Sequence, residues 1–294
     1  MRLLLDSFWR AVAYCLHPRV IVLSLAPLAL MAIVGVGLGY FYWTPAVAWM
    51  REALDAWPIL STFWGWIGAD AANFKDVLAP MGVIFLATPV VVVVSLLIVA
   101  GMMAPALTGL VAKRRFPVLQ EKHGASFFLS VFRSLGLTLL AMLALVVSIP
   151  LWLVPPLVIV LPPIIWGWLT YQVMSFDALA EHASADERRQ LLRAHRWPLM
   201  GIGVLCGYLG AAPSIVWASG VVFAAAFFVL IPLAIWIYTL VFAFSALWFA
   251  HYCLDALARQ RAERAAEQAA AVPALPESAT TDVTAAATSQ WKAP

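Results

Sequence analysis

The residues of this chain that could bind a ligand carry a hydroxyl group or are glycines. They lie where prolines and other glycines interrupt the apolar stretches. The positions with these features are Thr108, Gly109, Ser148 and Ser214. The first N–H groups of a helix lack partners and carry about half a positive charge, so a helix broken inside a membrane can hold an anion. We therefore predict anion-binding breaks near 105–109, 148–156 and 207–214, with an ordinary kink or turn as the alternative at each.

Basic residues form a second candidate set, in two short connections between apolar stretches. They are Lys113, Arg114, Arg115, Arg188, Arg189, Arg193 and Arg196. Such clusters usually set the orientation of a membrane protein and meet anionic lipid. They could also attract an anion to a cytoplasmic mouth, and both interpretations stay open.

Deep in the apolar stretches the chain has essentially no ionisable residue, and this limits its chemistry. The stretches 134–176 and 197–254 contain no Lys, Arg, Asp or Glu. A proton-relay pump or an intramembrane hydrolase would need such residues. The chain also lacks a Walker motif, G-x-S-x-G and H-E-x-x-H, and its three cysteines form no C-x-x-C. We expect no catalytic residue, no metal, no cofactor and no nucleic-acid partner.

The composition predicts an all-α, polytopic integral membrane protein. Apolar residues make up 64% and charged residues 11% of the chain, against about 45–50% and about 25% in soluble domains. One crossing takes about 20 residues, so each of the two uncharged stretches is too long for one crossing. Basic residues lie on both sides of each stretch, and we therefore predict that each is a helical hairpin.

These features divide the chain into three parts. They are an N-terminal amphipathic interfacial helix at 1–19, a membrane domain at 20–265 and a disordered tail at 266–294. Within the membrane domain we predict spans at 20–43 and 77–112, an external loop at 44–76, hairpins at 134–176 and 197–254, and a cytoplasmic segment at 177–196. The distribution of Lys and Arg places both termini in the cytoplasm.

Prolines and caps refine this plan. Prolines place the reversal of the first hairpin at 148–156, and the glycines of 207–214 mark that of the second. Because the first reversal has almost no polar residue, it is either a tight apolar turn between two full crossings or the tip of a re-entrant hairpin buried against protein. Ser184 and Glu187 form an S-x-x-E capping box that predicts a helix starting near Ala185.

Several short motifs occur in an order and spacing that are similar to those of a known family. They are Ser7-Phe8, His17-Pro18-Arg19, Ala26-Pro27-Leu28, Ala104-Pro105 with Gly109-Leu110, Tyr171-Gln172, Phe176 through His182, and Gly207 through Pro213. Over about residues 7–255 the chain resembles the CysZ-type sulfate permeases, which are grouped with the etoposide-induced family of membrane proteins. It departs from them at 105–109, where the spacing is one residue longer, and at Lys113, where the family has an acidic residue.

The resemblance implies long spanning helices, two hairpins that penetrate the membrane only partly, and a homo-oligomer. It also implies a bacterial inner-membrane permease that admits sulfate passively or with weak coupling and supplies cysteine synthesis. The expected partners are then the lipid bilayer and sulfate or a similar oxyanion. A non-transporting membrane scaffold or assembly protein of the same fold is the alternative.

Overall fold

The computed structural model describes residues 2–57, 71–122, 127–211 and 220–271. Within these ranges the chain forms helices and no strand, which confirms the all-α prediction. The elements are α1 (Arg2–Cys15), α2 (Pro18–Ala56), α4 (Ala71–Arg115), α5 (Phe127–Ser148), the 3-10 helix η2 (Ile149–Leu153), α6 (Pro155–Ala180), α7 (Ala185–Ala194), α8 (Arg196–Ala211) and α10 (Gly220–Ala271). Five helical segments, in α2, α4, α5 with η2, α6 and α10, are long and apolar enough to cross a membrane.

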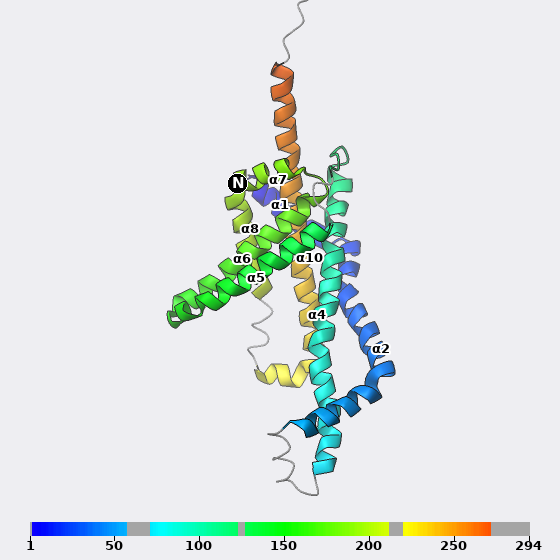
Figure 1. Cartoon of the computed structure of the whole chain (residues 1–294). Coiled ribbons are helices and arrows are strands. Elements are labelled where there is room, and N and C mark those ends of the chain that lie inside the picture. Colours follow the sequence, from blue (N-terminus) through cyan, green and yellow to red (C-terminus); the bar gives the residue numbers. More distant parts are fainter. Residues whose placement is uncertain (1, 58–70, 123–126, 212–219, 272–294) are drawn as a thin grey trace, which may run out of the picture.

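The helices α2, α4 and α10 run side by side and form the long axis of the molecule (Figure 1). The sequence predicted a span at 20–43 and an external loop at 44–76, and the helices of the structure extend into this predicted loop from both sides. That the loop is external stays a prediction. Helix α2 continues to Ala56 and α4 already begins at Ala71. A proline can be accommodated in a membrane helix by a kink. Pro45 therefore does not end α2, and Figure 1 shows that this helix bends in its second half.

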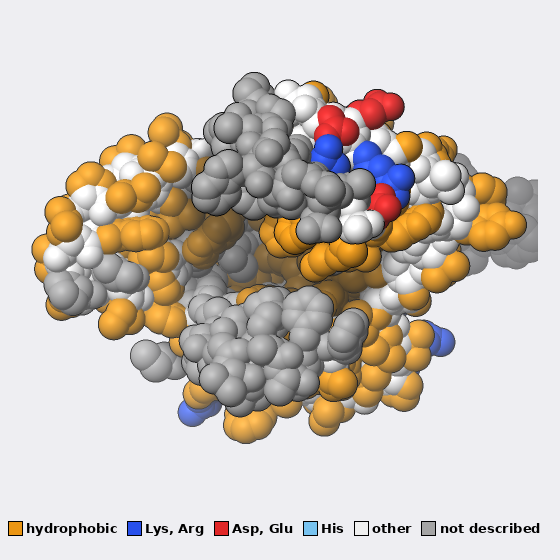
Figure 2. All heavy atoms as spheres, turned by 90° about the horizontal axis from the view of Figure 1, so that it is seen from below, with side chains coloured by type: hydrophobic (Ala, Val, Ile, Leu, Met, Phe, Trp, Pro, Cys, Tyr) orange, Lys and Arg blue, Asp and Glu red, His pale blue; other side chains and the backbone are white. Residues whose placement is uncertain are grey.

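Two ion pairs join the far ends of α2 and α4. Arg51 lies 2.9 Å from Asp76, and Lys75 pairs with Asp55. Seen from this end, the described surface is largely apolar apart from one small group of acidic and basic side chains and a few isolated basic ones at the edges (Figure 2). Exposed pairs of this kind contribute only about 0–1 kcal/mol each, so we infer that they align the two helices more than they stabilise them.

The first predicted hairpin is confirmed as α5, η2 and α6. Helix α5 ends at Ser148 and α6 begins at Pro155, and the two helices pack against each other. At the reversal, the Ser148 hydroxyl donates to the Leu145 carbonyl at 2.7 Å and accepts from Trp152 Nε1 at 3.1 Å. The hairpin leaves the long axis obliquely (Figure 1). Whether it crosses fully or is re-entrant stays a prediction.

Glycines on α6 and α8 let these two helices approach closely. A Cβ on Gly203 would lie 2.2 Å from the Gly167 carbonyl oxygen, and a Cβ on Gly167 would lie 2.5 Å from Val204 Cα. Gly207 continues this contact and lies inside α8, which ends at Ala211. Small residues spaced four apart allow such close contact between membrane helices. Of the reversal predicted at 207–214, residues 207–211 are therefore helical, and residues 212–214 lie outside the described residues.

The two arms of the second hairpin differ in length. With 16 residues, α8 is about 24 Å long at 1.5 Å per residue, which is shorter than a hydrocarbon core of about 30 Å. By contrast α10 has 52 residues and contains Pro232. Figure 1 shows α10 bending near its beginning and projecting past the other helices at its end. Helix α10 runs to Ala271, so residues 266–271 are helical and the predicted start of the disordered tail at 266 is too early. Residues 272–294 of that predicted tail lie outside the described residues.

At the end of the molecule that carries α7, hereafter the α7 end, helix α1 packs against α10. The Trp248 indole donates to the Ser7 hydroxyl at 3.1 Å, and the Phe8 ring lies 5.0 Å from that of Trp248. On α1, Trp9 is 67% exposed, which fits a helix that presents an apolar side to the interface. The predicted capping box is confirmed: the Ser184 hydroxyl accepts from the Glu187 N–H, and the Glu187 carboxylate accepts from the Ser184 N–H.

Candidate functional site: a basic cavity at the α7 end

A cavity of about 420 Å³ lies between the end of α4 and the last third of α10. Its charged lining consists of Arg115, Lys122 and Arg261, and no carboxylate of the described residues lines it. The remaining lining is the turn 116–120 together with Ala258. The cavity is therefore a recess lined by basic and apolar side chains.

The local sequence explains the turn that forms one wall. Pro117 disfavours helical backbone at the residue before it, and α4 accordingly ends at Arg115. The Phe116 N–H then donates to the Ala112 carbonyl at 2.8 Å and satisfies a terminal acceptor of the helix. Further along, the Lys122 N–H donates to the Glu181 carbonyl at 3.0 Å. The turn is thereby fixed to both α4 and the end of α6.

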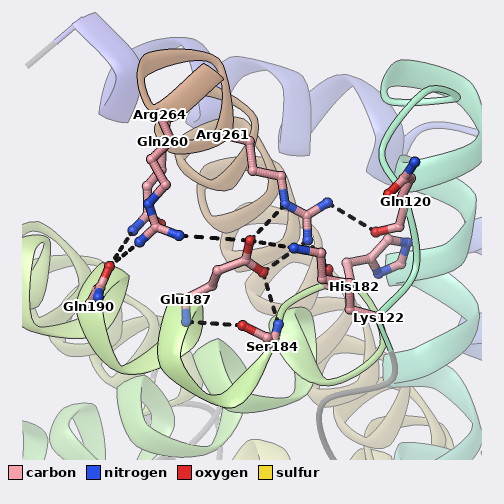
Figure 3. Close-up of polar contacts among 9 residues, drawn as sticks. All are labelled: Gln120, Lys122, His182, Ser184, Glu187, Gln190, Gln260, Arg261 and Arg264. Carbon is pink, nitrogen blue, oxygen red and sulfur yellow. Dashed lines mark hydrogen bonds and ion pairs between the residues drawn. The ribbon is translucent and has the colours of Figure 1, made fainter. Parts of the chain in front are cut away.

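A buried carboxylate behind the cavity holds two of its basic side chains. Glu187, whose side chain is 6% exposed, accepts from Arg261 Nη2 at 3.0 Å and from Lys122 Nζ at 2.9 Å (Figure 3). Arg261 also donates to the carbonyls of His182 at 2.6 Å and Gln120 at 3.0 Å. Arg261 thus connects α10 to α7, to the segment just before α7 and to the turn that follows α4.

The Glu187 carboxylate remains ionised at any ordinary pH. Burial raises its pKa, but hydrogen bonds from Arg261, Lys122 and the Ser184 N–H outweigh burial and lower the pKa to about 2. Arg264 adds a third basic partner, with Nη1 3.9 Å from Glu187 Oε1. One negative charge therefore faces three positive charges.

The cluster beside the cavity, formed by α1, α4 and α10, also has more basic than acidic members. Arg115 lies 3.2 Å from Asp6 and 4.0 Å from Asp255. Arg10 forms a second ion pair with Asp6, and Arg259 forms one with Asp255. A hydrogen bond from Arg10, together with Arg115, lowers the pKa of Asp6 against the effect of burial. The α7 end thus keeps a positive charge around the cavity.

The structure separates the basic residues that the sequence singled out. Arg115 lines the cavity, and Arg188 is buried on the other side of α7. The others are exposed at this end of the molecule: Lys113, Arg114, Arg189, Arg193 and Arg196. Lys122 and Arg261 were not predicted as site residues, because only the folded chain places them beside Arg115.

The predicted anion-binding hydroxyls are not brought together in the described structure. Helix α4 runs unbroken through Pro105, so the break expected at 105–109 is absent, and the Thr108 hydroxyl donates to the Ala104 carbonyl at 3.0 Å. Ser148 lies at the distant hairpin tip, where its hydroxyl donates to Leu145. A hydroxyl has one proton to donate, and in both residues it is already used.

The other two predicted positions add no donor in the described structure. Gly109 has open space where a Cβ would lie, and Ser214 lies outside the described residues. Substrate binding at all four positions stays a prediction. Within the described ranges, no three His, Cys, Asp or Glu side chains are grouped so that they could hold a metal ion.

The long apolar helices define a multi-pass helical membrane protein with a basic recess at one end. Residues 7–219 match the family described as Sulfate transporter CysZ/Etoposide-induced protein 2.4, and the chain belongs to this family. The resemblance noted from the short motifs is thereby confirmed. No curated protein and no solved structure matched the chain in the comparisons.

Proposed function

We propose that this protein carries sulfate, or a similar oxyanion, across the bacterial inner membrane as a homo-oligomer with both termini in the cytoplasm. The observation that carries the proposal is the basic cavity at the α7 end of a chain that belongs to a sulfate transporter family. Guanidinium groups bind oxyanions through charge-assisted hydrogen bonds. In this proposal the cavity receives the anion on the cytoplasmic side.

Arg115 is the basic residue of the cavity best suited to meet the anion. Lys122 and Arg261 are hydrogen-bonded to Glu187. Arg115 donates to Asp6 through Nη2 at 3.2 Å, and its Nη1 is buried without a hydrogen-bond partner among the described residues. An N–H group in this position gains more from an arriving oxyanion than one that already has a partner. Substrate binding by the hydroxyls and glycine predicted from the sequence stays a prediction apart from this cavity.

Sulfate uptake is expected to depend on Arg115. We predict that proteoliposomes of the purified protein take up radiolabelled sulfate faster than empty vesicles, and that Arg115→Gln weakens apparent affinity about tenfold, since a hydrogen bond to a charged group contributes about 1.5–3 kcal/mol. The adjacent Arg114→Gln, on an exposed side chain, is the matched control. If the folded wild-type protein shows no uptake, the permease proposal is wrong and the scaffold function is favoured.

The re-entrant form of the first hairpin predicts a protected tip. Val154 is half exposed in the single chain, so partial penetration should place a cysteine at Val154→Cys within the membrane or against another copy. We expect an impermeant maleimide added outside to label it at least tenfold more slowly than Glu52→Cys on α2. The background should be low, because burial raises the pKa of the Cys15 thiol to about 11 and the thiolate is the reactive form. Equal labelling rates would establish two full crossings.

A further inference from the structure

Arg188 on α7 is a buried cation whose charge no described residue neutralises. It is 8% exposed, and its Nη1 is buried without a hydrogen-bond partner. No carboxylate among the described residues forms an ion pair with it. The preceding residue, Glu187, has two hydrogen-bonded basic partners. Burying an unpaired charge is strongly unfavourable, so Arg188 requires a counter-charge that the described chain does not supply.

A second guanidinium group lies near Arg188 and increases the need for a negative counter-charge. The Cζ atoms of Arg188 and of Arg133, on α5, lie 4.3 Å and 4.8 Å from the centroid of the Phe176 ring. The two Cζ atoms are therefore at most about 9 Å apart, and the two positive charges gather around one ring. Burial lowers the pKa of Arg188, and the positive charges of Arg133 and Arg189 lower it further.

The other polar groups nearby leave this charge in place. Arg133 donates to the Gln172 amide oxygen at 3.3 Å, which brings no negative charge. Asp177, which follows Phe176 in the chain, accepts from the Ser130 hydroxyl and forms no ion pair with either arginine in the described structure. The Phe176 ring contributes the negative face of its π system. A ring face is a weak partner for two full charges.

We propose that Arg133 and Arg188, set on the Phe176 ring where the α5–α6 hairpin meets α7, bind a tetrahedral oxyanion such as a sulfate or phosphate group. A planar guanidinium presents paired N–H groups that match two oxygens of such an anion. The ring holds both guanidinium planes in place before the anion arrives, which reduces the entropy lost on binding. The site lies apart from the cavity of Arg115 and Arg261, on the hairpin side of α7.

The oxyanion could come from solution or from a lipid headgroup, and two arms of one experiment separate these sources. In the first arm, sodium sulfate and sodium phosphate are titrated calorimetrically into detergent-purified, delipidated protein at low ionic strength. In the second, native mass spectrometry counts phosphatidic acid or phosphatidylglycerol molecules retained by the protein, with phosphatidylcholine as the uncharged reference. Binding in the first arm identifies a soluble anion; binding in the second alone identifies a lipid phosphate.

The variants test the two arginines directly. We expect Arg188→Gln and Arg133→Gln each to weaken binding at least tenfold in whichever arm the wild type binds, and Arg189→Gln, on the exposed neighbour, to change it less than twofold. Arg133 is exposed, so its variant tests the site even if Arg188→Gln folds poorly. Without ligand, Arg188→Gln should melt no lower than the wild type, because it removes an unpaired buried charge; a purely structural Arg188 would lower the melting temperature with or without ligand.

The proposal is overturned if neither ligand class binds, or if both glutamine variants bind as tightly as the wild type. These outcomes are independent of the transport function, because binding is measured at equilibrium. A chain that fails to carry sulfate could still hold a lipid phosphate here. Conversely, sulfate transport with binding unchanged in both variants would refute this site and leave the proposed function standing.

Discussion

Substituting Gly203 by alanine is expected to destabilise the protein by about 3 kcal/mol or more, at the upper end of the cost of overpacking a core. The added Cβ would lie 2.2 Å from the Gly167 carbonyl oxygen and 3.0 Å from Tyr171 Cβ. Both α6 and α8 would have to move apart, because the obstruction is backbone rather than the end of a flexible side chain. Since α8 packs more extensively against α6 than against any other described element, its position would be lost.

The same helix supplies a matched control for this prediction. A Cβ on Gly201 would meet no atom within 4 Å, and alanine is the better helix former. We expect Gly201→Ala to melt within about 2 °C of the wild type in detergent. At about 2–4 °C per kcal/mol, Gly203→Ala should melt at least about 6 °C lower. Equal melting temperatures for the two variants would show that α6 and α8 are not in backbone contact.

These glycines illustrate what can be predicted from a membrane sequence and what cannot. Uncharged length and prolines were enough to locate the reversal near Ser148, because few other arrangements satisfy the backbone of so long an apolar stretch. Gly207 was different. A glycine can serve either in a chain reversal or in a close contact between helices, and its own sequence does not tell which. The close contact is recognised only once the folded chain places Gly167 of α6 beside Gly207.

The break predicted beside Thr108 failed for a related reason. A proline removes one hydrogen bond, but α4 packs against α2 and α10, and neighbouring helices allow a membrane helix to tolerate that loss. The cavity was beyond sequence reasoning altogether. Glu187 and Arg261 are 74 residues apart, and no local pattern reports which charges meet across such a separation.

Glu187 should be the carboxylate whose loss costs the most. Substituting Glu187 by glutamine leaves Arg261 and Lys122 without a counter-charge, and breaking a buried ion pair in this way costs about 3–5 kcal/mol. We expect Glu187→Gln to melt about 6 °C or more below the wild type at pH 7, at about 2–4 °C per kcal/mol. Glu263→Gln, which removes an exposed carboxylate from α10, is the control and should melt as the wild type does.

The acid dependence of stability should identify Glu187 independently. Its folded pKa of about 2 lies below the ordinary value of 4.5. The stabilisation is therefore fully present above pH 4.5 and is lost as the pH falls towards 2. At 1.36 kcal/mol per pKa unit this amounts to about 3 kcal/mol.

Melting temperatures recorded from pH 6 to pH 2.5 test this assignment. The wild type and Glu263→Gln should lose stability steeply below pH 4.5. The curve of Glu187→Gln should be lower at pH 6 and shallower, so that the three proteins converge in acid. A variant that starts lower but falls as steeply would assign the acid sensitivity to another carboxylate and leave Glu187 with a packing role alone. Convergence would establish that the Glu187–Arg261 pair joins α7 to α10 through its charge.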